Sequence, residues 1–243
     1  MNPSNPVFNE TEWAKIHAMS SERMTLEGTA TKSLILLGII TVTAMATGMM
    51  TIQTPGMGFI IMIGGLIGGL ITALVLIRGN QERAPMLAPV YAVFEGMLLG
   101  PITIMYESYY EGIAMNAVSL TLAVAIAMGF LYTSRIIKLT EGMKIALTSA
   151  IMGIFLVYIV NMIMMLFGSN IAILHSSGPL GIGLSLLIIA VASFSLLMDY
   201  EFIENGVKNG APKHMEWYAA FGLIVTLIWL YLEMLRLLAK LRR

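Results

Sequence analysis

Seven long apolar stretches follow one another along the chain, and they constrain its fold more than any motif does. Each is close to the roughly 20 residues that a helix needs to cross the hydrocarbon of a bilayer. They cover Ser33–Ile52, Gly58–Ile77, Ala84–Met105, Gly112–Tyr132, Ile145–Phe167, Gly178–Met198 and Trp217–Leu238. Residues are 58% hydrophobic and only 12% charged, against an apolar share of about 45–50% in soluble domains. We therefore predict an all-α, polytopic membrane protein with about seven transmembrane helices in one bundle.

The stretches leave little chain for anything else. We expect residues 1–29 to form a short polar arm and residues 30–243 to form a single transmembrane domain. The polar start of the chain lacks the basic and apolar regions of a cleaved signal peptide. Residues Gln53–Met57, Tyr106–Glu111 and Gly168–Ser177 contain neither Lys nor Arg, whereas the other connections are basic. Since positive loops remain in the cytoplasm, we expect a cytoplasmic N-terminus.

The basic C-terminus conflicts with this orientation. An odd number of crossings sends it outside, yet it carries Arg236, Lys240, Arg242 and Arg243. Earlier loops usually dominate orientation, so seven crossings are retained. A re-entrant or distorted last helix would also satisfy the rule.

The sequence excludes several kinds of chemistry. It has no Cys, and its three His residues, His17, His175 and His214, lie far apart. Thiol catalysis, thiolate metal sites and a His-Glu-x-x-His zinc site are therefore absent. A single Asp cannot form an aspartyl protease dyad, and no P-loop is present. Equal numbers of basic and acidic residues, 14 of each, give no attraction to nucleic acid. We expect no enzyme and no resident cofactor.

Glycines and acidic residues within the apolar stretches are the remaining features. Gly64, Gly65, Gly68 and Gly69 form overlapping small-xxx-small patterns, which favour close helix packing inside the bundle, with a dimer face or a mobile gate as alternatives. Glu95 lies roughly 16 Å into the third stretch. A carboxylate at that depth is protonated or faces a polar interior, unless it is simply hydrogen-bonded to backbone or to a residue such as Asn161.

Asp199, the only aspartate in the chain, directly follows the sixth apolar stretch. The residues after it suggest that the helix continues about another two turns, which would bury Asp199; the alternative is an interfacial charge. Glu201 and Glu204 are expected to be solvated. Glu233 lies three residues before Arg236, where opposite charges meet on a helix, so an ion pair at the membrane boundary competes with a functional role. Glu216 has the position of an interfacial charge beside aromatic residues.

Several sequence stretches resemble the Bax inhibitor-1 family, and more narrowly its bacterial branch. The resemblance covers nearly the full length, and its specific parts are Met198–Glu204 (MDYEFIE) and Glu216–Leu238 (EWYAAFG to WLYLEMLRLL). It implies a bundle in which six helices surround the last. It also implies a cation path, usually a calcium leak, controlled by a pair of acidic residues on the sixth and seventh helices.

Asp199 matches the sixth-helix member of that pair. Matching Leu-Tyr-Leu-Glu assigns the seventh-helix role to Glu233, whereas matching Leu-Arg-Leu-Leu places Thr226 there. Depth along straight helices makes Glu95 a nearer partner than Glu233. The family's arginine latch has Arg78 as its only nearby candidate. Whether Glu233, Glu95 or neither partners Asp199 remains open.

These observations lead to two functional hypotheses. The first is a pH-sensitive cation leak of a bacterial cytoplasmic membrane, in which Asp199 and Glu233 sense pH and Glu95 lines the ion path. Calcium is the favoured ion because hard cations take oxygen ligands, which Asp199 and Glu95 could supply transiently. The second is a non-conducting regulator that binds another membrane protein through its glycine face and N-terminal arm.

Overall fold

The computed structural model describes residues 23–79 and 81–243, and this part of the chain is built from helices. Seven of them are long and apolar enough to span a membrane, as the sequence predicts. These are α2 (Leu26–Gln53), α3 (Pro55–Arg78), α4 (Ala84–Tyr109), α5 (Ile113–Thr133), α6 (Glu141–Leu166), α8 (Pro179–Lys208) and α9 (Met215–Leu241). Two short turns, η2 (Gln81–Arg83) and α7 (Ala172–His175), complete the connections. The protein is therefore a multi-pass membrane protein.

Helices α2 and α6 begin before their apolar stretches, and a threonine side chain caps each of them. The Thr25 side chain accepts a hydrogen bond from the Gly28 amide at 2.9 Å, so α2 begins at Leu26 and includes the last residues of the expected 1–29 arm. Residues 1–22 of that arm lie outside the described residues. Pro55 and Pro179 occupy the first positions of α3 and α8, where a missing amide hydrogen costs nothing.

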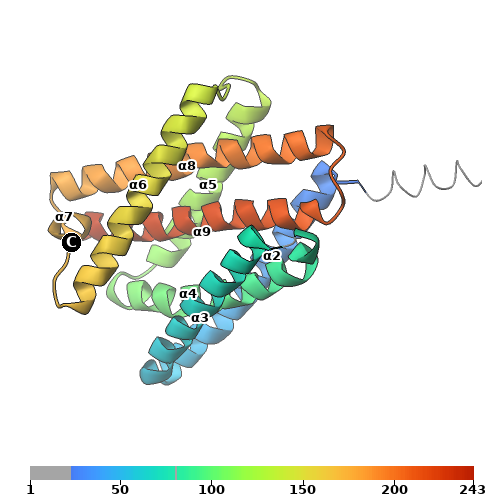
Figure 1. Ribbon diagram of the computed structural model, residues 1–243. Coiled ribbons are helices and arrows are strands. Elements are labelled where there is room, and N and C mark those ends of the chain that lie inside the picture. The colour runs from blue at the N-terminus through green and yellow to red at the C-terminus, as the bar shows by residue number, and fades with distance from the viewer. Residues whose placement is uncertain (1–22, 80) are drawn as a thin grey trace, which may run out of the picture.

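Helix α8 continues for nine residues past Asp199, as the sequence suggests, and then ends in a tight reversal. Gly210 has a positive φ of 65°, which glycine adopts without strain. The Ala211 amide donates to the Gly206 carbonyl at 2.9 Å and the Gly210 amide to Val207 at 3.1 Å. This pair of bonds is a Schellman ending. It returns the chain as α9, antiparallel to α8 (Figure 1).

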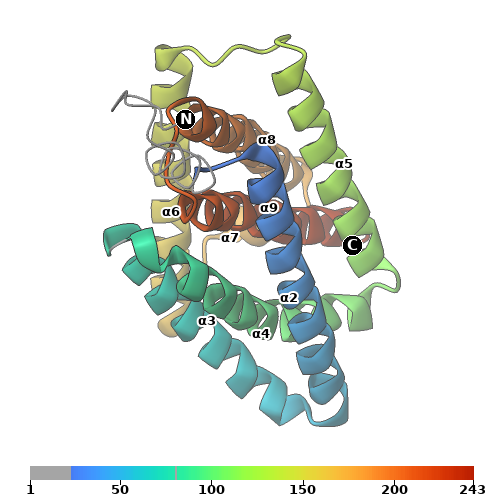
Figure 2. The same cartoon turned by 90° about the vertical axis from the view of Figure 1, so that its right-hand side faces the viewer.

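Helix α9 is the central element. Half of its most apolar window is buried, as in α8, whereas only 6% of the corresponding window of α6 is buried. Helix α9 packs against α2, α4, α5 and α8, and Figure 2 shows it end-on among its neighbours. Helix α3 packs on α4 and α2 at the side of the bundle. The central position of the last helix is as expected, although α3 contributes mainly to the flank.

Candidate functional site: a buried carboxylate between α8 and α9

Asp199 lies on the side of α8 that faces α9, and its carboxylate is incompletely satisfied. Its Oδ2 atom is inaccessible to solvent and has no hydrogen-bond partner. The residue across the interface is Thr226, whose hydroxyl lies beside the carboxylate. That hydroxyl also donates a long 3.5 Å bond to the Gly222 carbonyl of its own helix. An unpartnered carboxylate oxygen inside a membrane bundle is costly, so Asp199 is the strongest candidate for a functional group.

Glu233 lies in a different cluster. It is buried, and its Oε1 accepts hydrogen bonds from the Tyr158 hydroxyl at 2.6 Å and from Arg236 Nη1 at 2.8 Å. Arg236 Nη1 also contacts the Tyr158 hydroxyl, so the three side chains join α6 to α9. Seven residues, or about 10 Å of helix, separate Glu233 from Thr226. Thr226 of α9 thus faces Asp199, and Asp199 and Glu233 form no hydrogen bond with each other.

Glu95 is buried at the interface of α3 and α4. A Cβ atom at Gly69 of α3 would lie 3.3 Å from Glu95 Oε1, so the carboxylate is directed at the glycine face of α3. The Tyr91 hydroxyl, one turn earlier on α4, lies beside it. The Asn161 side chain, a sequence-based candidate partner, instead accepts the Ile171 amide hydrogen at 2.9 Å. Glu95 and Asp199 therefore belong to separate helix interfaces.

Apolar side chains close the space around Asp199 along α8. One turn further on, Ile203 packs with Met24 and Ala219 in a small buried cluster. One turn before Asp199 lies Leu196, and one turn after Thr226 lies Leu230; both are fully buried. Apolar side chains thus flank Asp199 and Thr226 along both helices, while the Asp199 residue as a whole is half-buried.

Glu216 forms a buried clamp that the sequence did not reveal. It is 1% exposed, and its oxygens accept bonds from the Thr25 amide and hydroxyl at 2.9 Å each. Lys32 Nζ lies 2.5 Å from Oε2, and a Cβ at Gly28 would collide with the same carboxylate. The sequence predicts an interfacial charge at Glu216 but does not reveal its burial, because its partners lie at the other end of the sequence.

The other expected charges occupy the surface near the ends of helices. Glu201 pairs with Lys144 of α6 at 2.9 Å, and Glu204 pairs with Arg135 at 2.6 Å. These two glutamates, expected to be solvated, therefore link α8 to neighbouring segments. Arg78 lies exposed in the last turn of α3. Within residues 23–79 and 81–243, no group of three His, Asp or Glu side chains is close enough to hold a metal ion.

Comparison with known proteins agrees with this architecture. A family model described as Bax inhibitor 1 like matches residues 5–243. The chain belongs to the Bax inhibitor-1-like family. No curated protein and no solved structure matched it. In this member of the Bax inhibitor-1-like family, the helix that faces Asp199 presents a hydroxyl, from Thr226, in place of the second carboxylate that the resemblance implies.

Proposed function

We propose that this protein is a pH-sensitive cation leak of the bacterial cytoplasmic membrane, with calcium as the favoured ion. The observation that carries the proposal is the buried, unpartnered Oδ2 of Asp199. A carboxylate in this position must take a proton or a cation to avoid the cost of an isolated buried charge. Competition between the two would make ion passage depend on pH.

The neighbouring atoms suit weak and transient ion binding. Thr226 offers a hydroxyl oxygen, and its weak bond to Gly222 leaves that oxygen able to turn. Oxygen ligands are those that calcium prefers. Few ligands mean that a bound ion can leave again, which conduction requires. We infer that this arrangement is a closed state, and that the apolar cluster of Met24, Ile203 and Ala219 forms a gate between Asp199 and the end of the bundle where α2 begins.

The alternative, a non-conducting regulator that docks through its glycine face, has less support. A Cβ at Gly65 would lie 2.6 Å from the Leu98 amide nitrogen, and one at Gly68 would overlap the Phe94 ring. Helix α4 thus already covers the face that a partner protein would use. Without this surface, the regulator hypothesis rests on the N-terminal arm alone.

The test is flux through the purified protein in liposomes loaded with a calcium dye. We expect flux over empty vesicles to vary between pH 5 and 8, and Asp199→Asn to abolish that variation because an amide cannot titrate. Glu141→Gln is the matched control, since Glu141 is 85% exposed at the start of α6, and it should retain the wild-type profile. Absence of protein-dependent flux at every pH would reject the leak. A wild-type profile in Asp199→Asn would remove Asp199 from the mechanism.

A further inference from the structure

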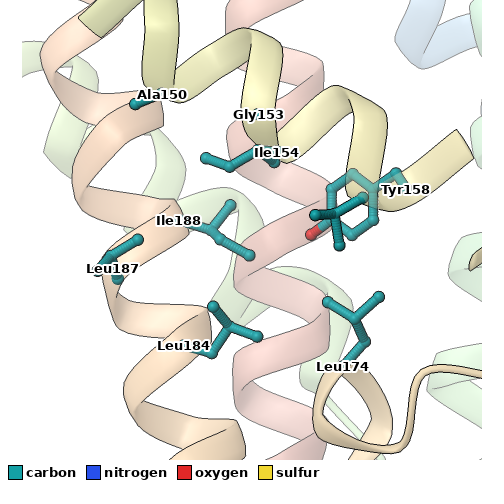
Figure 3. A pocket seen from close by; sticks show the side chains of 9 residues that line it. Ala150, Gly153, Ile154, Tyr158, Leu174, Leu184, Leu187 and Ile188 are labelled. Carbon is teal, nitrogen blue, oxygen red and sulfur yellow. The ribbon is translucent and has the colours of Figure 1, made fainter. Parts of the chain in front are cut away.

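A groove of about 250 Å³ lies between α6 and α8, at residues 184–188 of α8, which precede Asp199 in that helix. Leu184, Leu187 and Ile188 of α8 face Gly153 and Ile154 of α6 across it (Figure 3). The lining is almost entirely apolar. Helix α6 therefore touches α8 only loosely, and in a membrane the groove must be filled by something apolar.

The groove has a polar end. Tyr158 of α6 and Leu174 of α7 lie there, and the Tyr158 oxygen points toward α9 (Figure 3). That hydroxyl contacts Arg236, whose guanidinium carbon lies 4.8 Å from the centre of the Tyr158 ring. Tyr158 thus has its ring in the groove and its hydroxyl in the polar cluster at the C-terminal end of the bundle.

This cluster has an excess of positive charge. The charges of Arg236, Lys240 and Arg243 all act on His175, which adjoins Leu174. Glu233 neutralises one of them, through Arg236. Lys240 is buried yet donates to neutral oxygens only, the Gly181 carbonyl at 2.9 Å and the Ser185 hydroxyl at 2.8 Å. In the described part of the chain, Lys240 and Arg243 thus form no ion pair with a carboxylate.

Arg236 retains donors for a further ligand. Its bonds to Glu233 and Tyr158 use Nη1 alone in the described part of the chain. Its side chain is 30% exposed, so Nη2 and Nε are available to an anion. A phosphate suits a guanidinium well because two parallel N–H donors can bind two oxygens.

The length of the groove along α6 is close to the hydrocarbon thickness of one leaflet. The lining residues of α6 run from Ala150 to Tyr158, which is about 12 Å along the helix axis. Half of the hydrocarbon thickness is about 15 Å. The apolar groove thus extends from the basic cluster to near the bilayer centre, as an acyl chain does below its headgroup.

We propose that the α6/α8 groove binds one anionic phospholipid, with an acyl chain along the groove and the phosphate on Arg236 within the basic cluster. Charge complementarity selects an anionic headgroup over a zwitterionic one, and the apolar lining selects a chain-bearing lipid over a free anion. Residues 1–22 are poor candidates for the occupant, because they join the described chain at Arg23, which pairs with Pro212 at the opposite end of the bundle. A bound lipid would hold α6 against α8 and α9.

The experiment is lipid retention by the full-length protein in detergent, with equimolar phosphatidylglycerol and phosphatidylcholine of identical chains, measured by native mass spectrometry. We expect the wild type to retain one lipid and to prefer phosphatidylglycerol by roughly fivefold for each basic residue that the phosphate engages. Arg236→Gln should remove most of this preference. Arg243→Gln, at an exposed position that leaves the Glu233 pair intact, should reduce it.

Two glycines supply matched variants for the acyl chain. A Cβ at either Gly153 or Gly183 would meet no atom within 4 Å, but only Gly153 lines the groove. Gly153→Leu should fill the groove and lower retention roughly tenfold, whereas Gly183→Leu should retain lipid as the wild type does. Equal retention of the two lipids by the wild type, or equal retention by the two glycine variants, would overturn the proposal. A dimer that Gly153→Leu disrupts would identify the occupant as a second copy of the chain and would also overturn it.

Discussion

At the scale of single residues, the buried acids differ in how completely their partners satisfy them. Glu216 and Glu233 each have a cation and at least one further donor. Asp199 has an oxygen with no partner. A charge that is fully paired stabilises one arrangement of helices, whereas an unpaired one is ready to exchange a proton or an ion. This difference, rather than depth alone, singles out Asp199.

Replacement of Thr226 by Asp tests how the facing residue tunes Asp199. Two facing carboxylates in a medium of low dielectric cannot both ionise easily. If flux requires ionised carboxylates, we expect Thr226→Asp to move the pH transition of calcium flux toward neutral pH, by on the order of one unit. Thr226→Val removes the hydroxyl without adding a titratable group, and should keep the wild-type midpoint. If the wild type, Thr226→Asp and Thr226→Val had the same midpoint of the pH transition of flux, Thr226 would not be the residue that faces Asp199.

Glu233→Gln should reduce stability without altering pH sensing. The change leaves Arg236 without its counter-charge, at a cost of about 1–3 kcal/mol, less than for a fully buried pair because the Arg236 side chain is 30% exposed. Thermal unfolding in one detergent measures the loss. The flux profile should still follow Asp199. Flattening of that profile to the level of Asp199→Asn would instead make Glu233 the partner of Asp199.

His175 makes the C-terminal end of the bundle sensitive to acid. Burial, together with the charges of Arg236, Lys240 and Arg243, holds the pKa of His175 below its ordinary value of 6.5. Because the folded protein favours the neutral ring, its stability is complete above pH 6.5 and falls as pH drops through the lower pKa of the folded state. We expect His175→Gln to lose less stability than wild type between pH 7.5 and 5, measured by thermal unfolding. Parallel losses in the two proteins would show that other groups dominate.

At the scale of helices, close packing of α3 on α4 depends on individual glycines. A Cβ at Gly65 would lie 2.6 Å from the Leu98 nitrogen and 2.7 Å from the Phe94 carbonyl oxygen, and backbone atoms cannot move aside cheaply. At Gly64, the same atom would meet only the flexible end of Met97, at 3.8 Å. A side chain larger than hydrogen thus fits at position 64 but not at position 65.

We therefore expect Gly65→Ala to destabilise the protein by about 1–3 kcal/mol through overpacking. Gly64→Ala should be neutral or slightly stabilising, because alanine favours helix. Thermal unfolding of the two variants, side by side, is the measurement. Equal stability of the variants would mean that α3 and α4 pack less closely than described.

The sequence predicts helices far better than contacts between them. Apolar length fixes where a helix can cross a bilayer, so each predicted stretch lies within or close to an observed helix. The exact ends depend on local contacts; for example, the Thr25 side chain caps the start of α2 at Leu26. Which residue faces Asp199 depends on the rotation of α9 about its axis. The two possible motif matches assign the seventh-helix role to Glu233 or to Thr226. The packing of α9 against α8 brings Thr226 beside Asp199. The burial of Glu216 could not be predicted because its partners are distant in sequence.

At the scale of the whole molecule, seven helices that are long and apolar enough to cross the membrane predict that Arg23 and Arg243 lie on opposite sides of it. Because the sequence has no cysteine, single introduced cysteines can report on each side. The positive loops predict that Lys213→Cys, in the α8–α9 turn, is shielded from an impermeant thiol reagent applied outside intact cells. Ser169→Cys and Arg243→Cys should both react. Labelling of Lys213→Cys alone would reverse the orientation, and protection of Arg243→Cys alone would indicate a re-entrant α9.

The Glu216 clamp also has a consequence for biogenesis. Thr25 and Glu216 are 191 positions apart in the chain, so the Glu216–Lys32 ion pair can form only after almost the whole polypeptide has left the ribosome. Helix α2 packs along α4 independently of this contact. A chain truncated before its final helix would therefore keep the packing of its early helices but would leave Thr25 and Lys32 without the carboxylate that they contact in the complete bundle. The amino-terminal end of the first helix thus reaches its final contacts only when the last helix has been made.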